Sequence, residues 1–141
     1  LETAATVNFH FSMSQIKIYA RRDALENSRQ ALSDAIHGCV VQHLKLPPEK
    51  RFHRFFALEN DDFVFPADRS PRYTILEIAM MQGRSAETKR RLIRALFAEL
   101  ETQCAISPAD LEVQITESPR ENWGFRGMTG DEIALSYDVE I

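Results

Sequence analysis

The sequence lacks several features that mark particular classes of protein. It has only two cysteines, Cys39 and Cys104, each within a helical pattern, so we expect reduced, buried thiols and no disulfide framework. No stretch is apolar for long enough to cross a bilayer, and no signal-peptide pattern is present. These absences predict a cytoplasmic protein without membrane partners.

An excess of positive charge is also lacking. The 17 basic residues stand against 21 acidic ones, a balance that argues against a nucleic-acid partner. His37 and His53 have no Cys/His/Asp spacing around them that is typical of a metal site, and we interpret both as ordinary helix and strand residues. The sequence therefore predicts no metal and no cofactor.

The most informative stretch is residues 73–104. Its first part, residues 73–80, is rich in β-branched and apolar residues and predicts a buried strand. Gly83 permits a sharp turn, Ser85 is placed as an N-cap, and Glu87 puts a carboxylate in the first helical turn. A helix with one apolar stripe is expected to follow, formed by Leu92, Ile93, Leu96, Phe97 and Leu100.

The first half of the chain has the same order of elements. Residues 15–19 alternate as a strand, and Asp23 is a plausible N-cap for one long helix. Its apolar stripe consists of Leu25, Leu32, Ile36, Val40 and Leu44. Pro47 and Pro48 end that helix, a strand is predicted over residues 51–58, and residues 59–72 form a polar surface excursion.

The remaining segments are a strand, a loop and two terminal stretches. Residues 111–115 alternate as a strand with one buried face, a loop spans residues 117–130, and residues 135–141 alternate as a terminal strand. The chain opens with Leu1 and its first methionine is Met13, so we expect residues 1–12 to be a remnant or an N-terminal extension. Their alternation also fits an edge strand. Residues 13–141 are expected to form one domain.

The two halves match at a period of roughly sixty residues. The matched pairs are Tyr19 with Met80, Pro48 with Pro108, Phe63 with Trp123, and Phe65 with Phe125. Two βαβ repeats, about residues 14–72 and 73–141, predict an α+β fold with a four-stranded sheet and two helices on one face. The bare face needs a cover, and a homotrimer is the natural solution.

Two motifs resemble those of the tautomerase superfamily, which includes 4-oxalocrotonate tautomerase, malonate semialdehyde decarboxylase and macrophage migration inhibitory factor. The first is Gly83-Arg84-Ser85 followed by Glu87 and Lys89, and the second is the loop of residues 117–127, whose sequence is ESPRENWGFRG. The resemblance covers nearly everything from Met13 onward. It implies two fused βαβ units in a trimer, with sites at the subunit boundaries.

The resemblance also implies a chemistry. In that family an N-terminal proline moves a proton on a small keto, enol or unsaturated carboxylic acid, while arginines hold the substrate carboxylate. Ser14 replaces this proline, so activity as an isomerase is expected to be weak. Arg84 matches one family arginine, Arg51 or Arg54 the second, and Trp123 a pocket aromatic.

Alternatives remain at each of these positions. Arg84 is alternatively a surface arginine, although a positive charge at a helix N-terminus favours an anionic ligand. Trp123 is equally well explained as a packing residue that seals the loop. The chain as a whole is either a tautomerase-like enzyme or a non-catalytic trimer that binds a metabolite or a partner on the same scaffold.

Overall fold

The computed structural model of the chain describes residues 14–132. The first half contains β1 (Ser14–Arg21), α2 (Arg22–Leu25), α3 (Arg29–Leu44) and β2 (His53–Leu58). The second half contains β3 (Thr74–Met81), α4 (Ala86–Cys104) and β4 (Leu111–Ser118), followed by the hairpin of β5 (Gly124–Phe125) and β6 (Met128–Thr129). Short 3-10 helices span Asn60–Asp62, Pro108–Asp110 and Arg120–Asn122.

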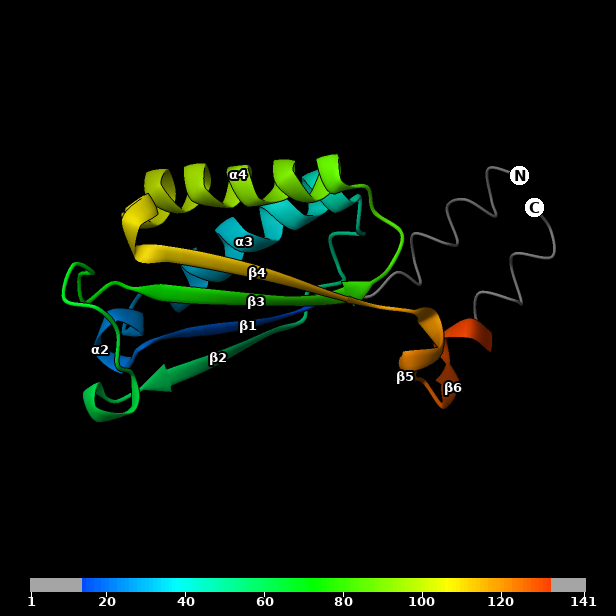
Figure 1. The fold of residues 1–141 in the computed structure, drawn as a ribbon, viewed down its shortest axis with the longest axis horizontal. Coiled ribbons are helices and arrows are strands. Elements are labelled where there is room, and N and C mark those ends of the chain that lie inside the picture. The colour runs from blue at the N-terminus through cyan, green and yellow to red at the C-terminus, as the bar shows by residue number, and fades with distance from the viewer. Residues whose placement is uncertain (1–13, 133–141) are drawn as a thin grey trace.

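The strands form one mixed sheet with α3 and α4 on the same face (Figure 1). The strand order is β2-β1-β3-β4. β1 runs parallel to β2 and β3 runs parallel to β4, whereas β1 and β3 are antiparallel. Each half is therefore a βαβ unit, and the predicted α+β fold of two such repeats is confirmed.

The core lies between the sheet and the two helices. Alternate residues of β1 and β3 are buried, as their period of two requires. Ile18 is paired with Leu76 at the centre of the sheet, and both are fully buried. α4 contributes a stripe at helical spacing, whose fully buried members are Leu92, Leu96 and Leu100.

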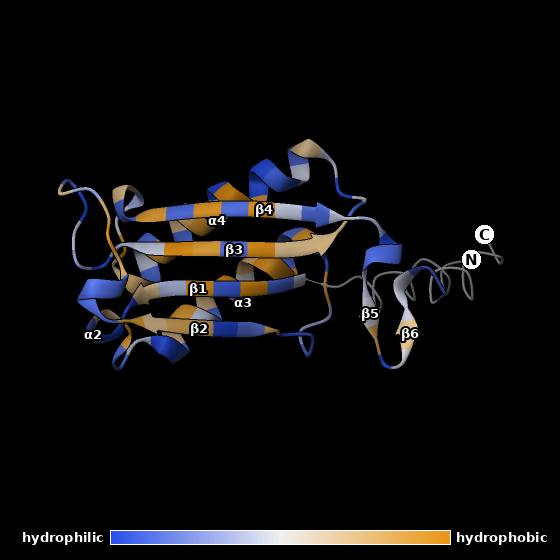
Figure 2. Cartoon of the chain, turned by 60° about the horizontal axis from the view of Figure 1, so that its bottom comes forward, coloured by the Kyte–Doolittle hydropathy of each residue, from blue (hydrophilic) through white to orange (hydrophobic). Residues whose placement is uncertain are grey.

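The opposite face of the sheet is not covered by any element within residues 14–132, and Figure 2 looks onto it. This open face is mixed in character. The Tyr19 ring stacks on Phe56 with 4.7 Å between ring centroids, and the Tyr19 hydroxyl donates to Glu77 Oε1 at 2.8 Å. Arg54 donates to Gln15 Oε1 at 3.2 Å on the same face. Aromatic side chains on a surface that no described element covers are typical of protein–protein interfaces.

The internal repeat has a period of sixty residues. β1 pairs with β2 in the register Ile16 to His53, and β3 pairs with β4 in the register Leu76 to Val113. The caps at Lys45 and Ala105 also match, since both are left-handed with φ of 59° and 56°. The predicted pairs at Pro48, Phe63 and Phe65 have this period.

The predicted match of Tyr19 with Met80 is wrong by one residue. Tyr19 is on the open face, whereas Met80 is fully buried on the helix face. At a period of sixty Tyr19 matches Ala79, which lies on the same face as Tyr19. A shift of one residue moves a strand side chain to the other face of the sheet. The separation between matched residues of β1 and β3 is therefore sixty and not sixty-one.

The first helix also differs from its prediction. We expected one helix from Asp23, but α2 ends at Leu25, Asn27 is left-handed with φ of 69°, and α3 begins only at Arg29. Asp23 binds Arg21 at 2.7 Å instead of capping a long helix. The left-handed residue interrupts the helical hydrogen bonds, because αL geometry points the backbone out of the helix.

Several other expectations concern the loops, the termini and the thiols. The predicted loop of residues 117–130 contains the β5–β6 hairpin, which extends beyond the end of β4 (Figure 1). The predicted strand at residues 135–141 and the alternating stretch at residues 1–12 lie outside the described residues. Cys39 is buried and Cys104 is partly buried, both as free thiols. Within residues 14–132 no helix is both long and apolar enough to span a membrane.

Candidate functional site

The candidate site lies at the end of the sheet where β1 begins and where β3 and β4 end. Ser14 is 5% exposed and pairs with Met80, which pairs in turn with Glu117. Paired residues point to the same face of a sheet, and Met80 is in the core on the helix face. Ser14 and Glu117 therefore share the helix side of this end of the sheet.

Arg84 is positioned by the turn that joins β3 to α4. Gly83 has φ of 139°, a conformation that favours glycine. Ser85 then caps α4 as predicted, since its hydroxyl accepts from the Thr88 amide at 3.1 Å. These two constraints place Arg84 beside the end of α3, where its Nη2 donates to the Leu44 carbonyl oxygen at 3.5 Å.

The guanidinium of Arg84 is partly withdrawn from water. Burial lowers the Arg84 pKa from its ordinary value, while the negative charge of Glu117 acts in the opposite direction. An arginine stays protonated in spite of such a shift. The loss of solvent therefore leaves a cation whose interactions with an anion are strengthened by the low local dielectric.

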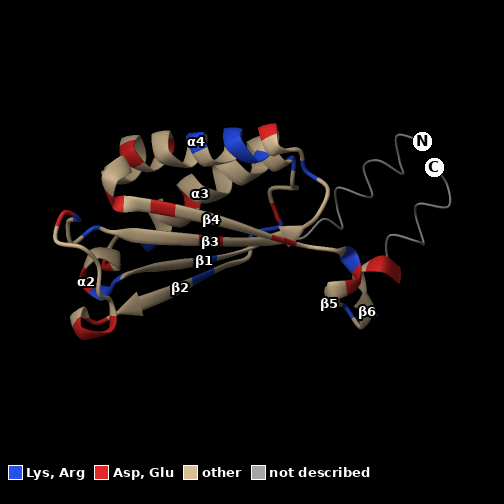
Figure 3. Cartoon of the chain, in the orientation of Figure 1, with Lys and Arg blue, Asp and Glu red and all other residues tan. Residues whose placement is uncertain are grey.

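The charges around Arg84 do not balance. Lys89 donates to Glu117 Oε1 at 2.7 Å, and the two side chains are 28% and 22% exposed. The second oxygen, Oε2, is buried without a partner among the described residues. Figure 3 shows further basic residues toward the N-terminal end of α4, where Arg90 and Arg91 form ion pairs with Glu87 and so add no unpaired charge. One carboxylate faces two cations, and the free amides of the α4 N-terminus add to the positive potential. The site is suited to a small anion.

The other predicted site residues lie apart from Arg84 within one chain. Arg51 forms an ion pair with Asp34 of α3 at 2.6 Å and also donates to Ser33 at 3.3 Å. Arg54 is on the open face of the sheet with Gln15. The structure thus places Arg51 and Arg54 on opposite sides of the sheet.

Trp123 directly precedes β5. The β5–β6 hairpin lies at the end of the sheet where the turn between β3 and α4 is found (Figure 1). Trp123 is half-buried, and its indole Nε1 is buried without a hydrogen-bond partner among the described residues. A buried indole N–H normally has an acceptor. The hairpin is held by a bond from the Gly130 amide to the Trp123 carbonyl at 2.8 Å. A Cβ at Gly130 would lie 2.4 Å from the Arg120 carbonyl oxygen, so only glycine fits there.

Sequence reasoning gave no role to Glu117, although it lies beside Arg84. A signal was present, because Glu117 continues the alternation of Leu111, Val113 and Ile115 and so falls on the buried face of β4. A carboxylate on an apolar face needs a nearby cation. Lys89, on α4, supplies it.

A second polar cluster lies between α3 and β2. The His37 Nε2 is 2.6 Å from the Pro48 carbonyl oxygen, and the His53 Nδ1 is 2.8 Å from the Ser33 hydroxyl. Burial is the main cause that lowers the His53 pKa to about 4. Among residues 14–132 no group of three or more His, Cys, Asp or Glu side chains is placed to hold a metal ion.

Comparisons with known proteins bear on the family and the fold of the chain. The family model described as "tautomerase enzyme" matches residues 50–126. The chain belongs to the tautomerase family. This tautomerase-family chain is 20% identical over 118 residues to the probable tautomerase YusQ of Bacillus subtilis. The aligned region covers 80% of this chain and 93% of that relative.

A shorter relative matches only part of the chain. It is a 2-hydroxymuconate tautomerase of Comamonas testosteroni, 33% identical over 57 residues. That match takes in 90% of the relative and 40% of this chain. The matched length is close to one repeat, as expected if a single unit of that relative corresponds to half of this fused chain.

Solved structures agree with the fold. A structure of malonate semialdehyde decarboxylase superposes with a TM-score of 0.76 at 25% identity, covering 86% of this chain and 97% of that one. A fused 4-OT described as an asymmetric trimer has a TM-score of 0.76 at 17% identity, covering 85% and 98% of the two chains. These likenesses extend across both repeats of this tautomerase-family chain.

Proposed function

We propose that the chain is a tautomerase-like enzyme that transfers a proton on a small keto, enol or unsaturated carboxylic acid, with Arg84 holding the carboxylate. One observation carries the proposal. The Arg84 guanidinium is partly buried and donates only to a backbone carbonyl among the described residues, while the one nearby carboxylate, Glu117, is bound to Lys89. An incoming carboxylate would give Arg84 the charged partner that it lacks.

The proposed enzyme acts as a homotrimer. The mixed open face, with Tyr19 stacked on Phe56 and bonded to Glu77, supports burial against a second copy. A fused 4-OT of the same fold is described as a trimer. Arg54 lies on this face, and we propose that it reaches the site of a neighbouring copy as a second carboxylate ligand. Arg51 is less suited, because Asp34 already pairs with it.

The proton-transfer group is the point at which the chain departs from its relatives. Ser14 stands at the start of β1, and a chain beginning there has a primary α-amine with a pKa of about 7.7–8, which is mostly protonated at neutral pH. Such an amine is a poor base for removing a proton from carbon. Trp123 would provide the aromatic wall of the pocket. Turnover is expected to be slow.

The runner-up is a non-catalytic trimer that binds a metabolite or a partner through the same arginine. The identity of Ser14 favours it, because a serine hydroxyl is a weak nucleophile and base unless an adjacent base activates it. Both proposals require Arg84 to bind a carboxylate. They differ in whether a proton then moves.

One pair of measurements separates the two proposals. Tautomerisation of phenylpyruvate and 2-hydroxymuconate is followed by absorbance, and binding of the same acids is followed by calorimetry, for the wild type and for Arg84→Ala. Turnover that disappears in the variant supports the enzyme. Binding that disappears in the variant, without turnover in either protein, supports the binding protein. If the wild type neither binds these acids nor turns them over, both proposals are refuted.

A further inference from the structure

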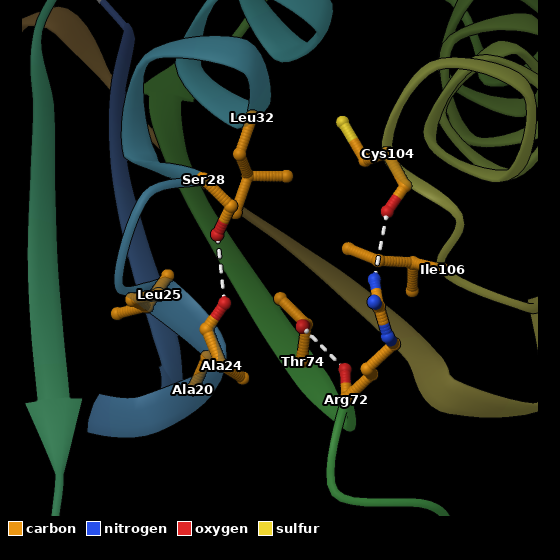
Figure 4. A pocket seen from close by; sticks show the side chains of 9 residues that line it. All are labelled: Ala20, Ala24, Leu25, Ser28, Leu32, Arg72, Thr74, Cys104 and Ile106. Atoms are coloured by element: carbon orange, nitrogen blue, oxygen red, sulfur yellow. Dashed lines mark hydrogen bonds between the residues drawn. The ribbon is translucent and has the colours of Figure 1, made fainter.

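A small cavity lies at the other end of the sheet from Arg84, between the start of α3 and the end of α4 (Figure 4). Its volume is about 30 Å³, roughly two to three times what one water molecule requires. Its walls include the apolar side chains of Ala20, Leu25, Leu32 and Ile106. Arg72 and Cys104 lie together on one side of it in Figure 4. The cavity is thus mainly apolar with one cation.

The period of sixty residues relates this cavity to the candidate site. Thr74 begins β3 as Ser14 begins β1, and Cys104 ends α4 as Leu44 ends α3. Arg72 Nη1 donates to the Cys104 carbonyl oxygen at 3.3 Å, the same kind of contact that Arg84 makes with Leu44. The two ends of the sheet therefore share one design, in which an arginine binds the last carbonyl of a helix beside the start of a central strand.

The arginines themselves do not follow the repeat. The position sixty residues before Arg84 is Ala24, which lines the cavity. Arg72 reaches its carbonyl from the segment just before β3 instead. At the cavity end of the sheet the guanidinium therefore comes from Arg72, which is not the repeat equivalent of Arg84. The internal repeat alone does not account for it.

The hydroxyl groups of the cavity wall are already hydrogen-bonded, whereas Arg72 keeps donors to spare. The Ser28 hydroxyl donates to the Ala24 carbonyl at 2.7 Å, and the Thr74 hydroxyl donates to the Arg72 carbonyl at 2.8 Å. Burial raises the pKa of the Cys104 thiol, so it remains neutral at pH 7. Arg72 has no ion pair with a carboxylate among the described residues. Its guanidinium carries five N–H donors, of which the Cys104 carbonyl takes one.

We propose that this cavity binds a short aliphatic monocarboxylate, with its hydrocarbon tail against Leu25, Leu32 and Ile106 and its carboxylate on Arg72. A volume of about 30 Å³ admits a tail of only a few carbons. Little apolar area is buried and the cation is at an exposed position, so the affinity is expected to be about millimolar.

This second site binds without catalysing. Thr74 is in the middle of the chain, so its nitrogen is an amide and cannot act as a base. Its hydroxyl is already committed to the Arg72 carbonyl. The site is independent of the proposed function, because neither Ser14 nor Arg84 contributes to it.

Methyl NMR of the full chain tests the proposal, with propionate as the probe and neutral propionamide as its uncharged analogue. Leu32 and Ile106 line the cavity. Leu92 and Leu46 occupy the equivalent positions in the opposite repeats, and their methyl signals serve as a reference away from the cavity. Propionate is expected to shift the Leu32 and Ile106 methyl signals in a saturable way. Propionamide is expected to bind about tenfold more weakly or worse, since it lacks the charge that Arg72 binds.

Two matched variants locate the carboxylate. Arg72→Gln is expected to weaken the propionate response of Leu32 and Ile106 by about tenfold or more, and Arg72→Lys, which keeps the charge, to restore part of it. Arg84→Gln should leave the response unchanged. An unchanged affinity in Arg72→Gln, equal responses to propionate and propionamide, or shifts confined to Leu92 and Leu46 would each overturn the proposal. Loss of Arg84-dependent binding alone would bear only on the proposed function.

Discussion

Arg84 lies against Leu44 at the C-terminal end of α3, with 3.5 Å between its Nη2 and the carbonyl oxygen. This distance is at the long end for a hydrogen bond. A carboxylate would accept from the guanidinium at about 2.7–2.9 Å, and in bidentate fashion. The bond to Leu44 is therefore weak, and exchanging it for a shorter bond to a carboxylate would be favourable.

Replacing Arg84 should weaken carboxylate binding. Arg84→Ala is expected to cost roughly 1.5–3 kcal/mol, the scale of a hydrogen bond to a charged group, or about ten- to hundredfold in affinity. Calorimetry with small keto acids measures it. Arg94→Ala, which removes an exposed arginine of α4, is the control and should bind as the wild type does. Equal affinity in all three proteins would contradict the assignment.

The residue at the start of β1 should limit turnover. We compare a chain that begins at Ser14 with one in which Ser14→Pro is the first residue. A positioned secondary amine is expected to raise tautomerisation by on the order of 10²–10⁴-fold, measured with phenylpyruvate and 2-hydroxymuconate. Combining it with Arg84→Ala should cancel most of the gain. No gain in the proline variant would mean that the pocket has diverged, and the binding protein would then be preferred.

The open face of the sheet should be the subunit interface. Phe56→Asp places a carboxylate beside the Tyr19 ring and near Glu77, where burial and repulsion disfavour association. Sedimentation at micromolar concentration is expected to show a trimer for the wild type and smaller species for the variant. The control, Ala98→Asp, adds the same charge at an exposed position of α4 and should remain trimeric. A wild-type monomer would refute the interface.

His53 should make the fold less stable in acid. Its pKa is about 4 in the folded chain against an ordinary 6.5, because burial, His37 and Arg51 all disfavour the charged ring. The unfolded chain binds the proton first, so stability is full above pH 6.5 and falls between about pH 6.5 and 4. Since the ring is only partly buried, we expect a loss of about 1–3 kcal/mol.

Urea unfolding at pH 7 and pH 4.5, at one protein concentration, measures this loss. His53→Gln keeps a polar group near Ser33 and should reduce the difference between the two pH values. His43→Gln, which removes a histidine near the end of α3, is the control and should show the wild-type difference. The same difference in both variants would exclude His53 as the cause.

The order of strands and helices was readable from the sequence because it depends on local periodicity. β3 and α4 follow from alternation, Gly83 and the Ser85 cap, and all three features act within a few residues. The break before α3 was not readable in the same way. It depends on a left-handed Asn27, a conformation that asparagine tolerates but does not require.

The site was less accessible to sequence reasoning, since it depends on register across the sheet. Arg84 followed from its motif. The choice between Arg51 and Arg54 was not decidable, because it rests on where β2 begins, and the structure begins it at His53. The cavity beside Arg72 was missed for another reason. Its counterpart residues become visible only when the repeat is fixed at sixty residues.

At each helix end, an arginine from one half of the chain binds the last carbonyl of the helix of the other half. Arg84 of the second half binds the end of α3, and Arg72 of the first half binds the end of α4. In a dimer of identical units, a substitution at one such end would be copied at the other by symmetry. Joining the units in one polypeptide removes that coupling. In the fused chain a substitution at Arg72 therefore changes one end of the sheet and leaves the contact of Arg84 at the other end in place.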